Sequence, residues 1–357
     1  MKKVAFAIVT DLHLDFVKAN RINYFGEVMD AMTHVLEIAE QYRTAGYDIN
    51  LILLGDVFDG SLSNASDAMQ ALEIFHYFCS YFSKVYSVVG NHEITYAQDN
   101  PFWFLVSDIQ DESLQRVKRY VQPRALKPDI ILPDTLTEGN VIFYFNHFGV
   151  PSKEPRDGDV RIGLFHQNVG SNDICKMWGT FDNVEEAAYI KGYTHCFFGH
   201  MHLAKGKYYV DEQHACLCEW LGAIGRTNVD EIKDDNLDVN VPVVLIEDGK
   251  LIKIEDNIIR LKSADECIDY VKLKASQKTR AILEERKEFA TNAFKGSTLL
   301  QTLEGAFAGT ALEILLSLLN KPWDEVLYAY KDTLREPVVD NVESDKEMED
   351  NNGTYIS

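Results

Sequence analysis

The stretch that decides the fold is VAFAIVTDLH, residues 4–13, in which an apolar run leads directly to an Asp-x-His pair. A short continuous apolar run is typical of a strand buried on both faces of a sheet. The same arrangement returns at LILLGD, residues 51–56, and at VYSVVGN, residues 85–91. Residues 24–46 and 64–82 carry apolar side chains at helical spacing. This alternation predicts an α/β fold with parallel strands, whose carboxyl ends meet where ligands bind.

The chain beyond residue 138 is again rich in short apolar runs. They predict further strands at 141–146, 160–165, 195–198, 207–210, 215–220, 241–247 and 251–255. Asp248-Gly249 lies between the last two runs and is a hairpin signal. The intervening residues 94–138 contain several prolines, and we expect an irregular excursion over the site with a helix near 103–119.

The character of the chain changes near residue 260. Residues 261–335 are predicted to be helical, and residues 336–357 form an acidic tail that we expect to be disordered. The apolar helix expected at 298–319 can pack on the first domain, on a partner or on a second copy of the chain. The sequence therefore divides into a domain at 1–260, a helical cap or partner-binding region, and a tail.

Composition limits the classes of protein that fit. The 357 residues carry a net charge of −21, which argues against a general nucleic-acid coat protein but not against a nuclease with a local basic patch. The amino-terminal residues have no signal-peptide pattern, and no uncharged run reaches membrane-spanning length. We expect a cytoplasmic protein, in the host cytoplasm if the source is viral, with no membrane contact.

The six cysteines contain no CxxC pair. We expect them to be buried as small apolar residues in a reducing compartment, and we expect no zinc site among them. They are Cys79, Cys175, Cys196, Cys216, Cys218 and Cys267.

Side chains that bind metals follow the predicted strands in five short blocks. Asp11 and His13 are two residues apart, so both point to one side if the chain is extended. Asp56 can bridge two ions with its two oxygens, and Gly55 before it permits a sharp turn. The other blocks offer the Asn91 amide and three imidazoles, those of His166, His200 and His202. Oxygen and nitrogen ligands without thiolate suit Mn²⁺, Fe²⁺ or Zn²⁺, so we predict two divalent metal ions.

Taken in order, these blocks resemble the calcineurin-like metallophosphoesterase superfamily over residues 1–260. The motifs are Asp11-x-His13, Gly55-Asp56-x-x-Asp59, Gly90-Asn91-His92-Glu93, His166 and Gly199-His200-x-His202. The resemblance implies a two-sheet α/β sandwich flanked by helices. It implies that one metal is held by Asp11, His13 and His202, that the second is held by Asn91, His166 and His200, and that Asp56 bridges them.

The resemblance also implies a catalytic role for His92, which is not a ligand in this family and faces the scissile phosphate. Two adjacent ions polarise the phosphoryl oxygens and acidify a water, while His92 stabilises charge or protonates the leaving oxygen. Asp59 can accept a hydrogen bond from His92 and fix its orientation. The alternative for Asp59 is a turn-capping role.

The branch of the superfamily is indicated by smaller features. No arginine follows Asp59, unlike in the phosphoprotein phosphatases. The segment 164–168, LFHQN, and the segment 220–226, WLGAIGR, are similar to elements of the SbcD-type double-strand-break-repair nucleases, although Trp220 and Ala223 depart from that pattern. This resemblance implies a manganese-dependent DNA exo- or endonuclease of bacteriophage origin, with an SbcC-type ATPase partner and a homodimer as further expectations.

Three basic residues are candidates for contact with DNA: Arg226, Arg119 and Lys205. Lys207 is a further candidate. The alternative for Arg119 and the other basic residues of the excursion at 94–138 is that they are ordinary solvated surface residues. The aromatic residues at 102–104 can stack on a base, although burial is the more usual fate of such residues.

Two other functions remain open at this stage. A nucleotide or small-substrate phosphodiesterase or phosphatase fits the acidic composition better than a nuclease does. A metal-stabilised interaction module is opposed by the intact His92, which structure alone does not require.

Overall fold

The computed structural model describes most of the first 281 residues. The described ranges are 2–15, 21–60, 65–95, 100–110, 114–115, 130–150, 155, 160–170, 182–183, 190–203, 205–210, 216–227, 229–232, 237–279 and 281. One compact unit comprises Met1–Ser276, and a second comprises Gln277–Ser357. The expected apolar helix at 298–319, the acidic tail, Arg119 and Cys175 lie outside the described residues. The predicted boundaries at residues 260 and 335 stay predictions.

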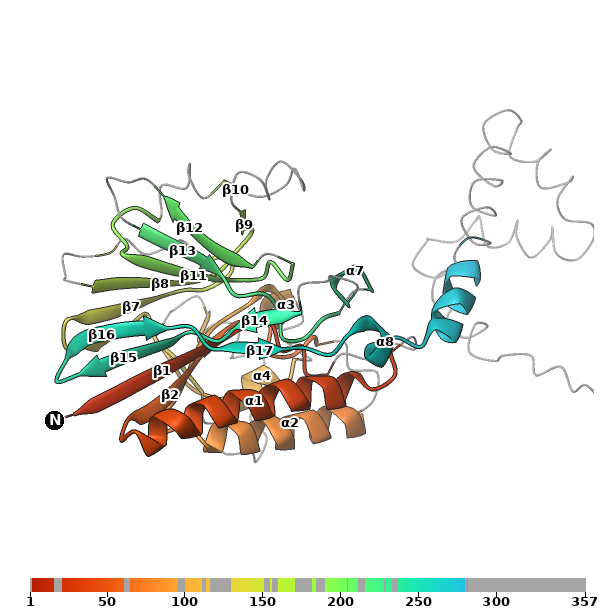
Figure 1. The fold of residues 1–357 in the computed structure, drawn as a ribbon, viewed down its shortest axis with the longest axis horizontal. Helices are drawn as coiled ribbons and strands as arrows, with labels where there is room; N and C mark the ends of the chain where they lie inside the picture. Colours follow the sequence, from red (N-terminus) through yellow and green to blue (C-terminus); the bar gives the residue numbers. More distant parts are fainter. Residues whose placement is uncertain are drawn as a thin grey trace, which may run out of the picture. The chain divides into compact units, whose positions relative to one another are not determined.

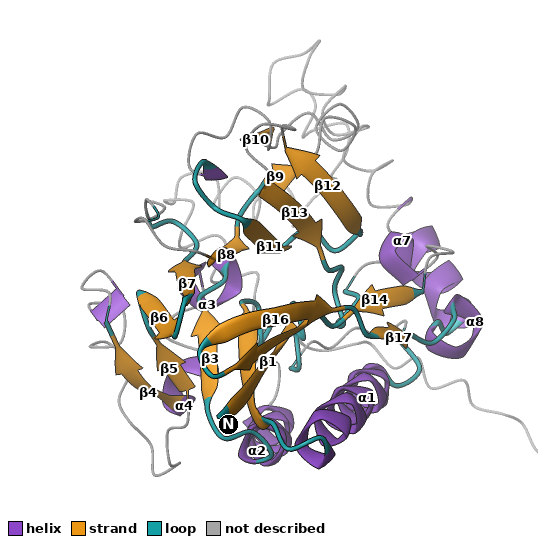
Figure 2. Cartoon of the chain, turned by 60° about the vertical axis from the view of Figure 1, so that its left-hand side comes forward, coloured by secondary structure: helices purple, strands orange, loops and turns teal. Residues whose placement is uncertain are grey.

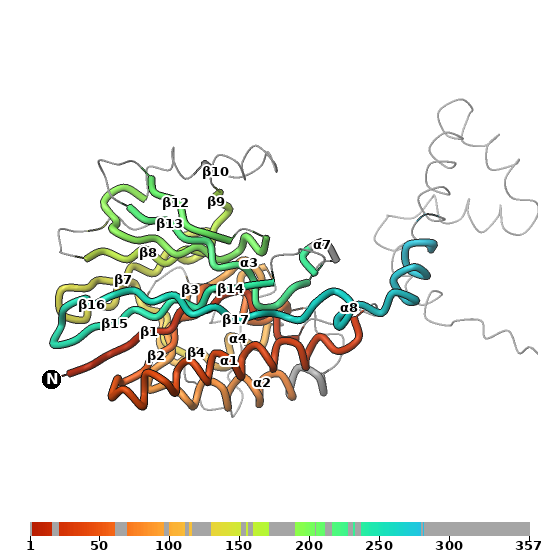
Figure 3. Tube along the Cα trace, in the orientation of Figure 1, coloured from red at the N-terminus to blue at the C-terminus, as the bar shows by residue number. Residues whose placement is uncertain are grey.

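The first sheet contains seven strands. In spatial order they are β16 (Lys250–Glu255), β15 (Val243–Glu247), β1 (Lys3–Val9), β2 (Asp48–Leu54), β3 (Val85–Val88), β5 (Ile130–Leu132) and β4 (Val106–Ile109). The pairs β1–β2, β2–β3, β3–β5 and β5–β4 are all parallel, as predicted for β1, β2 and β3. β15 pairs antiparallel with β1, so a segment about 240 residues further along the chain completes the sheet (Figure 3).

Two long helices, α1 (Tyr24–Thr44) and α2 (Ala65–Ser80), lie side by side against one face of this sheet (Figure 1). The Asn23 side chain caps α1 by accepting a hydrogen bond from Gly26 N at 3.0 Å. Gly46, with φ of 87°, lies just beyond its end. Buried residues of both helices and of β1, β2 and β3 form one continuous apolar core.

The second sheet contains six strands. In spatial order they are β12 (Gly206–Val210), β13 (Cys216–Trp220), β11 (His195–Gly199), β8 (Val160–His166), β7 (Val141–Asn146) and β6 (Thr135–Glu138). A second apolar core joins the two sheets, and in it the rings of Phe6 and Phe143 are 4.8 Å apart. Figure 2 shows the two sheets as separate layers with α1 and α2 outside the first. The predicted two-sheet sandwich is therefore confirmed.

Short elements connect these layers. They are α3 (Asn91–Thr95), α4 (Phe102–Leu105), α7 (Val229–Ile232), α8 (Ala264–Cys267), the pair β9 (Val169–Gly170) and β10 (Asp182–Asn183), and the pair β14 (Asp238–Asn240) and β17 (Ile258–Arg260). A further helical stretch occupies 270–279. Within the described ranges, no helix has the length and apolar character required to cross a membrane.

Some helix was expected near 103–119, and among the described residues Phe102–Leu105 and residues 114–115 are helical. After Leu105 the chain enters β4, a strand that was not predicted. Val106 pairs with Ile130 of β5, and Val106 and Ile109 are buried while the two residues between them are exposed. A distant strand supplies the hydrogen bonds here, and local periodicity carries no signal of it.

Candidate metal centre

The predicted ligand residues gather where parallel strands end. Asp11, Asp56 and Asn91 follow β1, β2 and β3, which are adjacent and parallel. In the second sheet His166 ends β8, and the neighbouring parallel strand β11 leads to His200. Because both sheets present carboxyl ends at this edge, all seven predicted metal ligands come from one region of the sandwich.

The backbone at these ligands differs from the extended chain that the Asp-x-His spacing suggested. Asp11, His13, Asp56 and His200 have φ of 51°, 45°, 48° and 75°. The left-handed region costs a non-glycine residue on the order of 1 kcal/mol or more, and such strain clusters at functional sites. Gly55 has φ of 85°, and a Cβ there would lie 2.6 Å from His166 Nδ1. The predicted sharp turn at Gly55 is confirmed. The absence of a Cβ at Gly55 also leaves room for the ring of His166.

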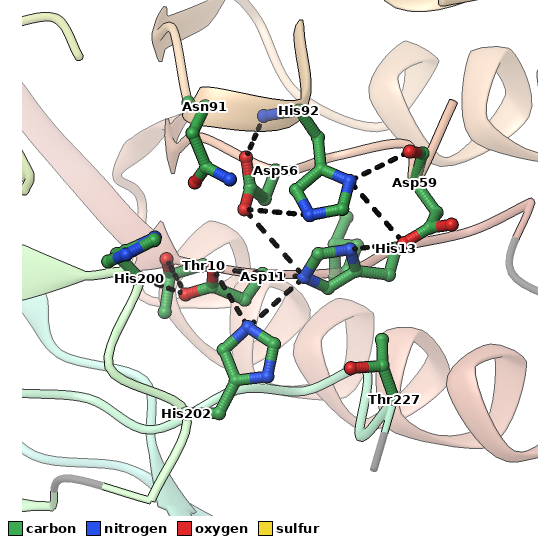
Figure 4. Close-up of polar contacts among 12 residues, drawn as sticks. Thr10, Asp11, His13, Asp56, Asp59, Asn91, His92, His200, His202 and Thr227 are labelled. Atoms are coloured by element: carbon green, nitrogen blue, oxygen red, sulfur yellow. Dashed lines mark hydrogen bonds and ion pairs between the residues drawn. The ribbon is translucent and has the colours of Figure 1, made fainter. Parts of the chain in front are cut away.

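Asp11, His13 and His202 form a first group of candidate ligands. His13 Nε2 lies 3.1 Å from His202 Nε2, and His202 Nε2 lies 3.5 Å from Asp11 Oδ1. Asp11 is anchored through its other oxygen, which accepts hydrogen bonds from Thr10 Oγ1 at 2.5 Å and from His200 N at 3.0 Å. Figure 4 shows the three side chains pointing toward one another.

Asp56, His166 and His200 form a second group, with Asn91 beside it. Asp56 Oδ2 is 3.2 Å from His166 Nε2, and Asn91 Oδ1 is 3.0 Å from the same nitrogen. His166 Nδ1 donates to the Leu54 carbonyl at 2.5 Å, which orients the ring. Asp56 Oδ2 is also 3.9 Å from His13 Nε2, so this carboxylate lies between the two groups, where a bridging ligand is needed.

His92 lies across from the first group, on α3, and is a quarter exposed (Figure 4). Its Nδ1 is 2.7 Å from the Asp59 carbonyl oxygen, and the Asp59 carboxylate is 3.4 Å away. The orienting contact expected of Asp59 therefore comes at closest from its main chain. Since a carbonyl only accepts hydrogen bonds, Nδ1 carries the proton and Nε2 faces the cluster, 4.0 Å from Asp56 Oδ2.

Electrostatics within the cluster stabilise charged carboxylates and imidazoliums. Burial alone would raise the pKa of Asp11, but the contact with His202 lowers it to about 2. Burial would lower the pKa of His166, but the charge of Asp56 raises it to about 9. Burial would lower the pKa of His202, but the neighbouring carboxylates of Asp11 and Glu231 raise it to about 10. Burial lowers the pKa of His200 to about 4. In the metal-free protein His166 and His202 thus each carry an additional proton, and metal ions bound at these two residues would replace those protons.

Residues that sequence analysis did not single out hold the ligand loops in place. Glu93 is fully buried and accepts hydrogen bonds from the backbone nitrogens of Asp56, Val57 and Gly90 at 2.8–2.9 Å. Burial raises its pKa to about 7. Its position directly after His92 was visible in the motif, but the loop that it supports lies more than 30 residues away.

Two more buried carboxylates act in the same region. Asp15 accepts from the backbone nitrogens of Asp59 and Gly60. Glu231 Oε1 is 3.0 Å from His202 Nδ1, on the side of the ring opposite Asp11. Neither had a sequence signal, because each depends on a contact between distant segments.

Of the three residues expected to bind substrate, the structure describes Arg226 and Lys205. Arg226 is buried, and its guanidinium donates to Glu27, the Lys262 carbonyl and Cys267. This placement opposes direct contact with substrate and favours a structural role. Lys205 is partly exposed, and its stem lies against Gly222.

Two further candidates for nucleic-acid contact are occupied elsewhere. Lys207 is paired with Asp256 at 2.7 Å and Glu219 at 3.5 Å. Trp103 is 2% exposed and donates to the Glu93 carbonyl at 2.9 Å, and Phe102 is fully buried. Phe102 and Trp103 therefore belong to the core, as the alternative prediction had it, while Phe104 is partly buried against it, and Trp103 supports α3.

The cluster fits a pair of divalent cations. Asp11 Oδ1 is buried and accepts no hydrogen bond. An unsatisfied buried carboxylate oxygen is costly unless a ligand completes its environment. The donors are carboxylate, amide and imidazole without thiolate, the set that borderline divalent ions accept.

Comparison with known proteins identifies the class of this site. The chain matches the calcineurin-like phosphoesterase family over residues 4–204, which is more than half of its length, and it belongs to that family. It is therefore a dimetal hydrolase of phosphoric esters. The comparison with curated proteins found no match.

Several solved structures are similar in fold. A dimetal phosphatase from Danio rerio is 13% identical with a TM-score of 0.41, and the alignment covers 72% of this chain and 99% of that one. A putative 5'-nucleotidase from Staphylococcus aureus is 13% identical with a TM-score of 0.39, covering 80% and 58%. An NAD nucleotidase from Haemophilus influenzae is 12% identical with a TM-score of 0.36, covering 73% and 51%. The chain thus spans little more than half of either nucleotidase.

Proposed function

We propose that this chain is a manganese-dependent phosphodiesterase that hydrolyses DNA. Asp11, His13 and His202 would hold one ion, Asn91, His166 and His200 would hold the other, and Asp56 would bridge them. Mn²⁺ is the proposed ion, and Fe²⁺ or Zn²⁺ would suit the same donors. When bound, such a pair supplies Lewis-acid activation of the phosphoryl group and an acidified water.

The observation that carries the proposal is the position of His92. Its Nδ1 proton is held by the Asp59 carbonyl at 2.7 Å, which leaves Nε2 directed at the cluster. A partly exposed imidazole in this position can stabilise charge on the phosphoryl group or give a proton to the leaving oxygen. His13, Asp56 and His92 also form a candidate metal group, so a catalytic His92 is the proposal and a ligating His92 is the alternative that metal analysis of His92→Ala tests.

DNA is the proposed substrate because segments 164–168 and 220–226 are similar to elements of the SbcD-type nucleases. Bacteriophage origin, an ATPase subunit as partner and a homodimer belong to the same proposal. A contribution of Arg119 and Lys205 to phosphate contact is part of it as well.

A nucleotide-sized substrate is the second candidate. Lys207 is paired with carboxylates, and Arg226 is buried against Glu27. A free nucleotide needs no long basic track, whereas duplex DNA gains much of its affinity from one. These two ion pairs favour the smaller substrate.

A substrate panel separates the two. Single- and double-stranded DNA, a small phosphodiester, a nucleotide and a phosphomonoester would each be incubated with Mn²⁺-loaded protein and with the variant Asp56→Ala. The nuclease proposal expects DNA cleavage that the variant abolishes. Cleavage of the monoester alone, also lost in Asp56→Ala, would exclude it and leave a phosphatase.

A further inference from the structure

A cluster of three cysteine thiols lies on the second sheet, apart from the carboxylates and imidazoles. Cys196 is on β11, and Cys216 and Cys218 are on the neighbouring strand β13. The register pairs Cys196 with Cys218, and side chains two residues apart on one strand share a face. All three sulfurs lie within 4.8 Å of one another, and those of Cys196 and Cys216 are 3.6 Å apart.

These spacings match a shared ion. Sulfur atoms bound at about 2.3 Å to one metal lie about 3.8–4.0 Å apart in tetrahedral or trigonal geometry. The Cys196–Cys216 spacing of 3.6 Å is close to this value, and the other two pairs of sulfurs lie within 4.8 Å. The thiols need only small side-chain rotations to meet at one point.

The surroundings select the kind of ion. The three cysteines are at most 3% exposed and belong to an apolar cluster with Tyr193 and Trp220. Among the described residues, no carboxylate or imidazole joins the candidate metal group that they form. An all-sulfur, apolar environment disfavours hard ions such as Mg²⁺ and favours soft ones.

Protonation of the thiols adds to this picture. Hydrogen bonds from the Cys196 and Cys218 thiols lower the pKa of the Cys216 thiol. Burial raises the pKa of Cys196 well above its usual value. Metal ions bind the thiolate form of cysteine, so binding of an ion at this cluster would release thiol protons to the buffer.

We propose that Cys196, Cys216 and Cys218 form a second metal site that binds one soft d¹⁰ ion, Cu(I). Structural Zn²⁺ takes four protein ligands, whereas three thiolates satisfy Cu(I). His200 directly follows the end of β11 and is four residues, or about 13 Å of strand, beyond Cys196. β13 continues to the segment that contains Arg226. An ion here would tie together two strands that support the dimetal centre.

The test uses the full-length protein already loaded with Mn²⁺, without oxygen and without thiol reductants. Cu(I) is supplied from a competing chelator, and bound copper and manganese are measured per chain. We expect one Cu(I) per chain, with X-ray absorption giving three sulfur neighbours at about 2.3 Å. Preferential binding of Zn²⁺, a copper shell without sulfur, or no stoichiometric copper would overturn the proposal.

Variants locate the ion. Cys196→Ser, Cys216→Ser and Cys218→Ser should each lose the bound copper, whereas Cys79→Ser, at a buried cysteine of α2 in the first apolar core, should keep it. Retained manganese and an unchanged circular dichroism spectrum establish that each variant is folded. If a serine variant does not fold, X-ray absorption of the wild-type protein decides alone. Equal copper loss in Cys79→Ser would contradict the assignment.

Discussion

One ring nitrogen of His92 is held by the Asp59 carbonyl, and the other faces the ligand cluster. His92 can therefore act either as a catalytic residue or as a metal ligand, and a substitution distinguishes the two roles. Geometry alone permits it to be a ligand, because its nitrogen lies within 4.8 Å of ligand atoms of His13 and Asp56. We expect His92→Ala to keep both ions and to lower kcat by about 10²–10⁴-fold, the usual contribution of general acid–base catalysis. Metal content and steady-state kinetics test this, with exposed His34→Ala on α1 as the control. Loss of an ion from the variant would make His92 a ligand instead.

Glu231 contacts the His202 ring at the nitrogen that faces away from Asp11, at 3.0 Å. Such carboxylates orient a histidine ligand and make it more basic, and their removal costs about 10–100-fold in metal affinity. Glu231→Gln should therefore weaken binding of one of the two ions, measured by competition with a chelator. Glu255→Gln makes the same chemical change on β16, where the carboxylate pairs with Lys253, and should leave affinity unchanged. Equal metal affinities in the two variants would show that Glu231 does not contribute to metal binding through His202.

At the scale of elements, a buried ion network connects α1 to the segment after β13. Glu27 of α1 contacts both Arg21 and Arg226, and all three are buried. Next to Arg226, Gly225 N donates to the Asp11 carbonyl at 2.7 Å. The network therefore anchors the segment that hydrogen-bonds to the Asp11 backbone. This favours a positioning role for Arg226 over the predicted contact with substrate.

Removing the centre of this network leaves two buried guanidiniums without their shared carboxylate. We expect Glu27→Ala to lower the free energy of unfolding by about 3–5 kcal/mol. Asp30→Ala, on the same helix, breaks the exposed pair with Lys262 and should cost less than about 1 kcal/mol. Urea unfolding of both variants makes the comparison. A Glu27→Ala cost no larger than that of Asp30→Ala would mean that the network contributes little.

The sequence predicted what depends on local pattern and missed what depends on distant contacts. The buried strands, α1 and the Asp248-Gly249 hairpin were predictable because periodicity and turn residues are local. β4 was missed because its partner, Ile130, lies 24 residues away. The positions of Asp11 and His202 followed from strand ends, but Glu231 and the Arg226–Glu27 contact required the fold.

At the scale of the whole molecule, metal binding and folding are linked through protons. In the metal-free protein the pKa of His166 is raised to about 9, against the effect of burial, by Asp56, and that of His202 to about 10 by Asp11 and Glu231. The ordinary value of 6.5 applies when the chain is unfolded. A raised histidine pKa stabilises the fold fully below 6.5, and this contribution is lost as pH rises through the folded pKa.

The metal-free protein should therefore lose stability steadily between pH 6.5 and about 10. Ions replace those protons, so Mn²⁺-loaded protein should show a much weaker dependence, and its advantage in Tm over the metal-free form should widen with pH. Thermal unfolding of both forms across this range provides the measurement, and calorimetry in two buffers of different ionisation enthalpy should detect proton release on Mn²⁺ binding at pH 7. A Tm difference that stays constant with pH, together with no proton release, would show that these two imidazoles are neutral before the metals bind.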